Sequence, residues 1–350
     1  MMFVRNLFVC YYAMTYVFFK MSLSEIKNKI FIINLHEEFE KIALEIFHYQ
    51  SKENKVYRKY IEQLKIDAEK VSSLSEIPFL PVEFFKYFEV LTGNEKAEIT
   101  FSSSGTTGAK QSRHFVSDPS IYEESFQKGF EIFYGDIKDY CILALLPSYL
   151  EREGSSLIYM VQDLIAESNN KQSGFHLHHL HNLHKILIQQ KEEGKSKTLL
   201  IGVTYALLDF TEEYKINFPE LIVMETGGMK GKRKEMVRDE LHKNLCEGFG
   251  VSHIHSEYGM TEMLSQAYSK GNGIFYTPPW MKVLIRDTND PAKMLGENQT
   301  GGVNIIDLAN IHSCSFIATQ DLGKVYKDGS FEVLGRFDNS DIRGCNLLVS

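Results

Sequence analysis

The sequence lacks an excess of positive charge and lacks paired cysteines, and each absence argues against a class of proteins. Its 38 lysine and arginine residues are outnumbered by 46 aspartate and glutamate residues, which gives a net charge of −8. Nucleic acid and anionic membrane surfaces are therefore not expected as partners, and any phosphate must be bound by local geometry. The five cysteines are scattered, without the spacing of a zinc site or a disulfide framework, which favours a reducing cytoplasm.

Residues 1–20 contain an apolar, aromatic run that follows Arg5. The run is shorter than the roughly 20 residues that a membrane-spanning helix needs, so no membrane span is expected. No small-residue cleavage site follows it, and Met21 is placed like an ordinary start. Two interpretations stay open, an extension from an upstream start codon and a targeting segment, and the fold prediction omits these residues.

A helical segment is predicted over residues 21–76. The evidence is the three-and-four spacing of apolar residues along one face, at Phe39, Ile42, Ala43, Ile46 and Phe47. Two prolines in 77–81 then force an extended path, which we interpret as the entry to a main domain over 77–334. Residues 335–350 are expected to form a C-terminal arm.

The main domain is predicted to be α/β, with a mostly parallel sheet covered by helices. Short apolar runs at 142–146, 198–203 and 221–224 have the composition of buried strands and are separated by helix-length segments. After the third run, Val237, Leu241 and Leu245 recur at four-residue spacing, which predicts the packed face of a covering helix. Residues 251–256 have the pattern of a further short strand.

The strongest local signal is the run of small and hydroxyl residues at 102–108, directly after the strand-like residues 98–101. Small residues let the backbone approach a phosphate, and amide and hydroxyl groups donate hydrogen bonds without adding net charge. The run therefore predicts a cradle for a triphosphate. Its alternative is a flexible Ser/Gly loop without a ligand.

A second glycine-rich stretch, at 226–233, is not a Walker loop, because that motif needs glycine where Thr226 stands and a hydroxyl where Arg233 stands. A P-loop kinase or GTPase is thereby disfavoured. What remains is a strand that ends at Glu225 and runs into Gly227 and Gly228, a bare backbone at the carboxyl end of a strand, where open α/β sheets bind ligands.

A third signal is the segment Tyr258–Glu262. Tyr258 offers a flat face for a purine and Gly259 a close turn. Thr261 offers a hydroxyl for a phosphate oxygen, and Glu262 a hard oxygen ligand for Mg2+.

Three such segments in this order resemble the adenylate-forming superfamily of acyl-CoA synthetases, peptide-synthetase adenylation domains and luciferases. Within it, the sequence is similar to acyl-protein synthetases of the LuxE type and to phenylacetate-CoA ligases. The resemblance runs from about Ile77 to the last residue. It rests on Ser103–Gly108, Gly227–Gly228, Tyr258–Glu262, Thr319–Gly323 and Gly335–Asp338, with support from Ile77–Phe85, Leu145–Glu151 and Arg343–Asn346.

The resemblance implies the large N-terminal domain of that superfamily, with ATP and Mg2+ as cofactors. The residues implied in ATP binding are Ser103, Ser104, Gly105, Thr106, Thr107, Gly108, Gly227, Gly228, Tyr258, Gly259, Asp321 and Arg336. Among these, the hydroxyl groups would hold the β and γ phosphates, and Asp321 would accept hydrogen bonds from the ribose. Thr261 would hold the α phosphate and Glu262 the Mg2+.

Superfamily members usually continue past the hinge into a small mobile domain, which is expected to be absent or vestigial here. LuxE-type enzymes carry the acyl group on a cysteine near the C-terminus, and Cys345 stands where the resemblance would put it. A thiolate is a good nucleophile toward an acyl phosphate, although a buried small residue is an equal alternative. Cys314 is the second candidate. Because the usual proline and lysine spacing after Gly108 is missing, no role is assigned to Lys110.

Two further features of the sequence are assigned no catalytic or ligand-binding role. The histidine-rich stretch at 175–184 is expected to be a solvated or partly packed helix rather than a metal site, since a zinc site usually takes ligands from more than one element. Trp280, the single tryptophan, is expected in the core or in a pocket wall.

The sequence thus predicts an acid-thiol ligase that adenylates a carboxylic acid, long-chain or aryl, and transfers the acyl group to a thiol. An acyl-accepting reductase or carrier protein is a candidate partner. Two alternatives stay open, a ligase that uses free CoA and a non-catalytic nucleotide-binding module. Acyl pockets are built from ordinary apolar side chains, so the identity of the acid stays open too.

Overall fold

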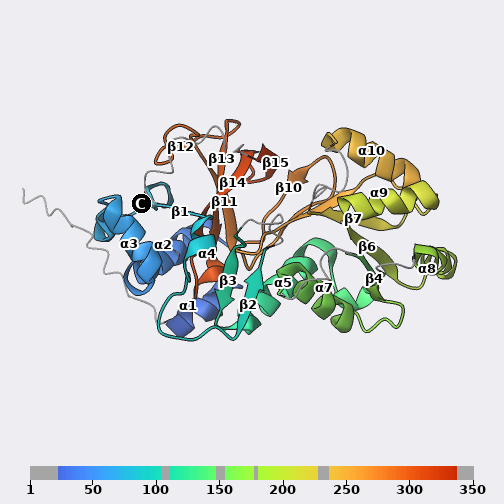
Figure 1. The fold of residues 1–350 in the computed structure, drawn as a ribbon, viewed down its shortest axis with the longest axis horizontal. Coiled ribbons are helices and arrows are strands. Elements are labelled where there is room, and N and C mark those ends of the chain that lie inside the picture. Colours follow the sequence, from blue (N-terminus) through green and yellow to red (C-terminus); the bar gives the residue numbers. More distant parts are fainter. Residues whose placement is uncertain (1–22, 104–109, 147–153, 177–179, 228–235, 337–350) are drawn as a thin grey trace, which may run out of the picture.

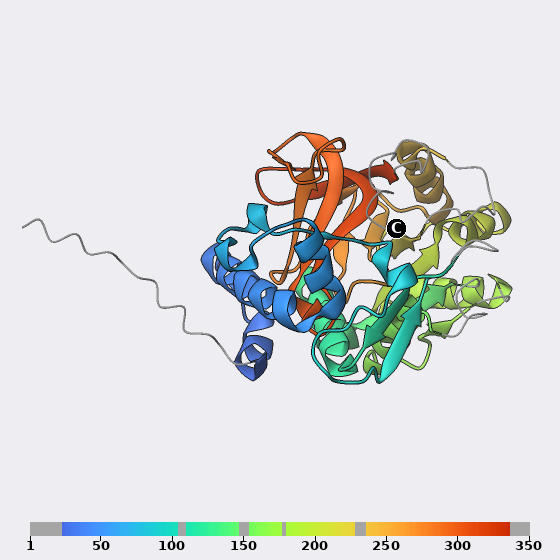
Figure 2. The same ribbon diagram turned by 60° about the vertical axis from the view of Figure 1, so that its left-hand side comes forward.

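The computed structural model describes residues 23–103, 110–146, 154–176, 180–227 and 236–336 (Figure 1). Two large sheets lie side by side, with a two-stranded hairpin near the place where they meet (Figures 1 and 2). The fold is α/β, as predicted.

The first sheet holds the strands that the sequence predicted. Its order is β5-β4-β6-β7-β8-β9, and β9 alone runs antiparallel to its neighbour. The strands are β4 (Tyr140–Leu145), β5 (Gly174–Phe175), β6 (Lys197–Val203), β7 (Ile222–Thr226), β8 (His255–Tyr258) and β9 (Ala267–Ser269). Every residue of β4 is buried, as expected for a strand covered on both faces. The strand predicted at 251–256 was misplaced, because β8 begins at His255.

Helices cover both faces of this sheet, with α9 and α10 on one side and α5 and α7 on the other (Figure 1). The helices are α5 (Pro119–Tyr134), α7 (Ser156–Glu167), α8 (Leu180–Glu193), α9 (Thr204–Glu213) and α10 (Arg238–Phe249). In α10, Leu241 and Leu245 are buried as predicted. Val237 precedes the helix and is 72% exposed, so its predicted place on the packed face was wrong.

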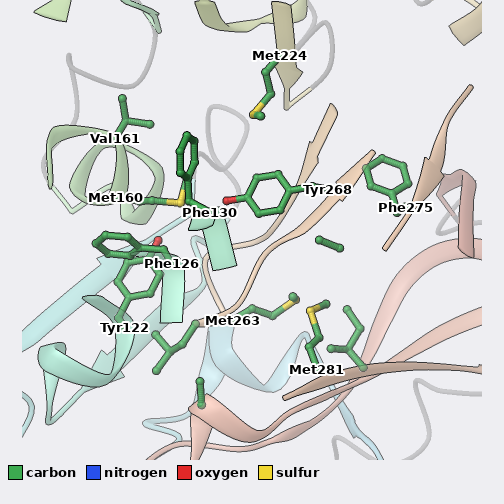
Figure 3. Packing of buried hydrophobic residues seen from close by; sticks show 14 of the residues in the cluster. Tyr122, Phe126, Phe130, Met160, Val161, Met224, Met263, Tyr268, Phe275 and Met281 are labelled. Atoms are coloured by element: carbon green, nitrogen blue, oxygen red, sulfur yellow. The ribbon is translucent and has the colours of Figure 1, made fainter. Parts of the chain in front are cut away.

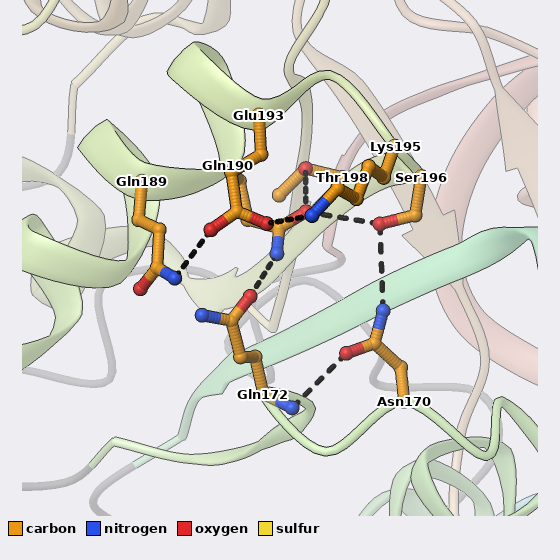
Figure 4. A network of polar contacts seen from close by, with 8 residues as sticks. All are labelled: Asn170, Gln172, Gln189, Gln190, Glu193, Lys195, Ser196 and Thr198. Atoms are coloured by element: carbon orange, nitrogen blue, oxygen red, sulfur yellow. Dashed lines mark hydrogen bonds and ion pairs between the residues drawn. The ribbon is translucent and has the colours of Figure 1, made fainter.

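A polar network joins α8 to the start of β6, at the opposite end of that strand from Val203 (Figure 4). Gln190 Oε1 accepts hydrogen bonds from Ser196 at 2.9 Å and Thr198 at 3.4 Å, and its amide nitrogen bonds Gln172. Because Gln190 and Thr198 are buried, these bonds satisfy groups that would otherwise be costly to desolvate. The network holds together the end of the sheet at which β6 begins.

The second sheet was not predicted and is mostly antiparallel, so the expectation of mostly parallel sheets holds for the first sheet only. Its order is β10-β15-β14-β13-β11-β12, and β1 pairs with β14 in parallel. The strands are β1 (Leu80–Pro81), β10 (Ile274–Phe275), β11 (Met281–Arg286), β12 (Met294–Leu295), β13 (Thr300–Asp307), β14 (Phe316–Val325) and β15 (Phe331–Arg336). Buried and half-buried residues alternate along β11, which is the pattern of a strand with one face in the core.

The predicted N-terminal helical segment packs on the second sheet. It contains α1 (Leu23–Ile30), α2 (His36–Glu53), α3 (Lys55–Gln63) and the short 3-10 helices η1 (Ala68–Lys70) and η2 (Leu74–Glu76). Tyr57 stacks on Phe316 of β14 with ring centroids 6.1 Å apart. The amide of Gln50 donates to the carbonyls of Asn310 and Ile311, next to η4 (Leu308–Asn310). The segment therefore shares the main core, and the boundary at residue 76 stays a prediction.

Aromatic and methionine side chains fill the space between the two sheets (Figure 3). They come from α5, α7, β7 and β9, from the segment between β8 and β9, and from β10 and β11. Together with Val161, those labelled in the figure are Tyr122, Phe126, Phe130, Met160, Met224, Met263, Tyr268, Phe275 and Met281. Trp280 belongs to the same core, 1% exposed, and its indole N–H donates to Ser125 and Ser265, both at 3.1 Å, as predicted for a core residue. No helix within the described ranges combines the length and apolar character that crossing a membrane requires.

Candidate functional site

The hydroxyl-rich loop connects β2 (Ile99–Ser102) and β3 (Arg113–Val116), which pair antiparallel. Next to the last pair of the hairpin, the amide of Ser103 donates to the Ser112 carbonyl at 3.0 Å, and the Ser112 amide donates to Ser103 Oγ at 2.9 Å. The loop between these two serines is thus closed at its base. Its remaining predicted residues, Ser104, Gly105, Thr106, Thr107 and Gly108, lie outside the described part of the chain.

Glu262 lies against the base of this loop. The Ser112 side chain forms a hydrogen bond with the Glu262 carboxylate, which is 6% exposed. Burial raises the pKa of Glu262, and the Ser112 hydrogen bond and the positive charges of Arg336 and Lys86 oppose that rise. Residues 103 and 262, which the sequence placed in one site, therefore adjoin the same serine.

The backbone that carries Glu262 is held from two sides. His114 Nδ1 lies 2.8 Å from the Thr261 carbonyl oxygen, and the side-chain amide of Asn310 donates to the Glu262 carbonyl at 2.8 Å. Burial lowers the pKa of His114 to about 4, so the ring is neutral near pH 7. The other ring nitrogen, Nε2, lies 3.0 Å from Asn310 Oδ1, so both nitrogens face acceptor oxygens and the neutral ring donates to one of them. Neither role could be predicted from the sequence, since neither residue belongs to a recognised motif.

Tyr258, Asp321 and Arg336 meet where the two sheets adjoin. Tyr258 Oη donates to Asp321 Oδ2 at 2.7 Å, and Arg336 Nε donates to Asp321 Oδ1 at 3.1 Å. Asp321 is 5% exposed, whereas the Arg336 side chain is 76% exposed. Burial, and then the Asp321 charge, raise the pKa of Tyr258 well above its usual value, so Tyr258 remains a donor. The structure thus brings together three residues that the sequence assigned to nucleoside binding.

Gly227 lies at the carboxyl end of β7, two residues beyond the Glu225–Ser256 pair of the parallel sheet. Its φ of +73° is a backbone conformation that favours glycine. Tyr258 lies two residues beyond the same pair on β8, so the two predicted residues end neighbouring strands. Gly228 lies outside the described residues.

A buried carboxyl that the sequence did not reveal lies beside Gly259. Thr226 Oγ1 donates to Glu257 Oε2 at 2.6 Å, and burial raises the pKa of Glu257 to about 7. A Cβ on Gly259 would lie 2.4 Å from Glu257 Oε1, so the turn at Gly259 leaves no space for a side chain. Adjacent residues of a strand point to opposite faces, so Glu257 faces away from the Tyr258–Asp321 side.

A second buried carboxylate, Glu225, supports the backbone that leads to Gly227. It accepts hydrogen bonds from Thr204 at 3.1 Å and Ser256 at 2.8 Å, and His242 Nε2 lies 3.6 Å away. Burial acts to raise the pKa of Glu225, but the partners His242 and Ser256 outweigh it and the pKa is lowered. Glu225 thereby connects α9, α10 and β8 next to Gly227, which the sequence assigned to ATP binding.

The two cysteine candidates have different outcomes. Cys345 lies outside the described residues, so its role stays a prediction. Cys314 is fully buried, and burial raises the pKa of its thiol to about 12. A thiol without solvent access and without thiolate character is not a nucleophile, so Cys314 was wrong as the second candidate.

The histidine-rich stretch is partly described. His184 stacks on Tyr214 with centroids 4.6 Å apart, and His176 is buried. His178 and His179 lie outside the described residues. Among all the residues that the structure describes, no three histidine, cysteine or acidic side chains are grouped closely enough to bind a metal ion.

The residues at the loop base nevertheless have the chemistry for Mg2+. Mg2+ takes oxygen ligands and is commonly held by one or two carboxylates together with substrate phosphates. Glu262 supplies a carboxylate beside the two serine hydroxyls of residues 103 and 112. This donor set fits a metal ion that is bound together with a nucleotide.

Part of the chain is similar in sequence to known proteins. Residues 18–117 match the family described as acyl-protein synthetase, LuxE. The long-chain-fatty-acid–luciferin-component ligase of Photorhabdus luminescens is 35% identical over 96 residues, which cover 25% of this chain and 82% of that protein.

Solved structures show the same fold at low identity. Crystal structures of 2-hydroxyisobutyryl-CoA ligase, one with 2-HIB-AMP and CoA and one with 2-HIB-AMP, have TM-scores of 0.60 and 0.61 at 13% identity. The two alignments cover 87% and 89% of this chain and 71% and 70% of those chains. An ATP-bound RpMatB-BxBclM chimera has a TM-score of 0.51 at 15% identity, and its alignment covers 68% of this chain but only 47% of the chimera.

The last alignment thus spans about half of the chimera's length. These likenesses confirm the predicted fold, that of the large N-terminal domain of adenylate-forming enzymes. Together with the 82% coverage of the Photorhabdus ligase, the sequence match shows that this chain belongs to the LuxE family of acyl-protein synthetases.

Proposed function

We propose that the protein uses ATP to activate a carboxylic acid as an acyl adenylate and then transfers the acyl group to a thiol. The observation that carries the proposal is that the base of the hydroxyl-rich loop adjoins Glu262: His114, two residues beyond Ser112, contacts the Thr261 carbonyl at 2.8 Å, and Ser112 lies within hydrogen-bonding reach of the Glu262 carboxyl. A loop that donates hydrogen bonds and a carboxylate that binds a metal ion are both needed at one triphosphate. The name of the Photorhabdus relative supports a long-chain fatty acid as the substrate, with an aryl acid as the alternative.

In the first step, a carboxylate oxygen of the acid attacks the α phosphorus of ATP. The bond from that phosphorus to the bridging oxygen breaks, and pyrophosphate leaves with the electron pair. Hydroxyl and amide groups of Ser103, Ser104, Thr106 and Thr107 hold the β and γ phosphates, and Thr261 holds the α phosphate. Mg2+, held by Glu262, would neutralise charge on the phosphate oxygens.

The nucleoside would be held at the junction of the two sheets. The Asp321 carboxylate accepts hydrogen bonds from the ribose hydroxyls while Tyr258 and Arg336 hold it in place. A carboxylate oxygen has two acceptor positions, so Tyr258 does not have to leave when ribose binds. Gly227 and Tyr258 would line the pocket for the base, and Gly228 is assigned to it by the family resemblance.

In the second step, a thiolate attacks the acyl carbon and AMP leaves with its oxygen. We assign the thiol to Cys345, from which the acyl group would pass to a reductase or carrier protein in the cytoplasm. If free CoA is the acceptor instead, Cys345→Ser leaves acyl transfer intact.

The test is acid-dependent exchange of labelled pyrophosphate into ATP, measured over a panel of fatty and aryl acids. The wild-type protein is expected to exchange with at least one acid, and Glu262→Ala to lose on the order of a hundredfold or more in rate. Folded wild-type protein that is silent across the whole panel contradicts the proposal and leaves a nucleotide-binding module.

A further inference from the structure

His114 and Asn310 contact the two carbonyl groups that flank the Cα atom of Glu262. One is the Thr261 carbonyl, which precedes this Cα and lies 2.8 Å from His114 Nδ1. The other is the Glu262 carbonyl, which follows it and accepts from Asn310 Nδ2 at 2.8 Å. Because a peptide group is planar, fixing both carbonyls restricts the backbone torsions on either side of Glu262. The direction of its Cα–Cβ bond is then fixed as well.

The segment that carries Glu262 forms few backbone hydrogen bonds of its own. The segment between β8 and β9 contains one backbone-to-backbone hydrogen bond among its described residues. It runs from the Met263 amide to the Met260 carbonyl, at 3.1 Å. The side chain of Glu262 must nevertheless reach Ser112 from a backbone without helix or strand geometry. External contacts therefore add to the local hydrogen bond that the Glu262 carboxyl forms with its own backbone in directing this side chain.

The two contacting residues are themselves held rigidly. His114 lies on β3, opposite Phe101 in the hairpin, and packs edge-on against Phe85 with ring centroids 5.7 Å apart. Asn310 ends η4, and its own carbonyl accepts from the Gln50 amide at 3.1 Å. Both residues are completely buried. His114 Nε2 also lies 3.0 Å from Asn310 Oδ1, so the two contacts meet in one cluster.

The cluster also connects two motifs that are far apart in the sequence. His114 is two residues beyond Ser112, on the strand that leaves the hydroxyl-rich loop, so a shift of this strand moves both contacts of Glu262 together. The loop base and the carboxyl group of Glu262 are thereby held together at the contact between the hairpin and the segment that follows β8. Resting on the proposed function, we infer that His114 and Asn310 are positioning residues that aim the Glu262 carboxylate at the Mg2+ of bound Mg·ATP.

Binding experiments test this inference without requiring turnover. The variants are His114→Leu, which keeps volume but removes the donor, and Asn310→Ser, which removes the amide. His114→Gln, which keeps an N–H, is the conservative variant. ATP affinity is measured by calorimetry with Mg2+ and, separately, in EDTA. We expect His114→Leu and Asn310→Ser to lose about tenfold or more in affinity for Mg·ATP while affinity in EDTA changes less than twofold, and His114→Gln to recover part of the loss.

His312→Gln is the matched control. This histidine is also buried and lies two residues beyond Asn310, but its ring nitrogen Nδ1 faces Glu95 at 3.9 Å, and its described polar contacts do not include residues 258–262. It should bind Mg·ATP like the wild-type protein. Melting temperatures of all variants separate a loss of folding from a loss of positioning.

Equal losses with Mg2+ and in EDTA, or no loss in a folded variant, overturn the inference. If His114→Leu does not fold, His114→Gln and Asn310→Ser decide the question by the same comparison. The proposed function fails separately, when wild-type protein binds Mg·ATP but exchanges pyrophosphate with no acid. Wild-type affinity for ATP that does not depend on Mg2+ also overturns the positioning role.

Discussion

Tyr258 Oη donates a 2.7 Å hydrogen bond to Asp321 Oδ2 across 63 positions of the chain. Tyr258 is the last residue of β8 in the mostly parallel sheet, and Asp321 lies in β14 of the antiparallel sheet. This bond therefore joins the two sheets at the proposed nucleoside site. The Tyr258 ring packs edge-on against Phe275 and Phe331, with centroids 5.9 and 5.6 Å away, which keeps its hydroxyl directed at the carboxylate.

Tyr258→Phe keeps the ring and removes this donor. Asp321 is buried, and hydrogen bonds to charged groups contribute about 1.5 to 3 kcal/mol, so we expect a stability loss of that size together with weaker ATP binding. Denaturant unfolding and ATP titration measure the two effects. Tyr140→Phe is the control, since its hydroxyl donates to the Tyr134 carbonyl at 2.7 Å, away from the site. It should lower stability and leave ATP affinity unchanged; equal ATP affinity in both variants contradicts the assignment.

The sequence predicted the parallel sheet because it contains short, continuous apolar runs such as 142–146, separated by segments of helix length. It did not predict the antiparallel sheet, whose strands carry glycines, as at 301 and 302, and one half-buried face. Motif residues such as Tyr258 and Glu262 could be named because their chemistry is local. His114, Asn310 and Glu257 could not, because their roles depend on contacts between segments up to 196 positions apart, which only the fold brings together.

Gly259 has no space for a side chain. The nearest atom to an added Cβ is Glu257 Oε1 at 2.4 Å, and Glu257 cannot turn away without breaking its bond with Thr226. We expect Gly259→Ala to cost about 1 to 3 kcal/mol in unfolding free energy, by overpacking and by loss of that buried bond. Gly174→Ala is the control, because nothing lies within 4 Å of its added Cβ. Equal stability of the two variants in thermal unfolding would show that the Gly259 turn adapts.

Two neighbouring buried glutamates should give opposite pH dependences of stability. The pKa of Glu257 is raised to about 7 in the folded protein, so between about pH 4.5 and 7 the folded state keeps a proton that the unfolded state loses. Its ionisation therefore costs stability as the pH rises through this window, by about 3 kcal/mol in total. Glu257→Gln removes this effect, so the variant should gain stability relative to wild type from pH 4.5 to 8.

Glu225 provides the opposite case. Its folded pKa is lowered, so its charged form stabilises the protein above the unfolded pKa and this contribution is lost as the pH falls. Glu225→Gln should therefore lose more stability, relative to wild type, at pH 8 than at pH 4. Urea unfolding of both variants and wild type over this range measures the differences. A Glu257→Gln difference that does not change with pH would mean that folding does not raise the pKa of this carboxyl.

The two cysteine candidates can be separated by labelling with radioactive acid in the presence of ATP. Cys314 is enclosed in the core, and its thiol donates to the Phe316 carbonyl at 3.5 Å. Cys314→Ala should cost stability, about 1 kcal/mol for the small cavity, and leave covalent labelling unchanged. Cys345→Ser should abolish stable labelling while acid-dependent pyrophosphate exchange continues, because adenylation precedes transfer. If Cys345→Ser keeps its label, the acyl group is carried elsewhere; if wild-type protein exchanges pyrophosphate but never becomes labelled, a free thiol such as CoA is the acceptor.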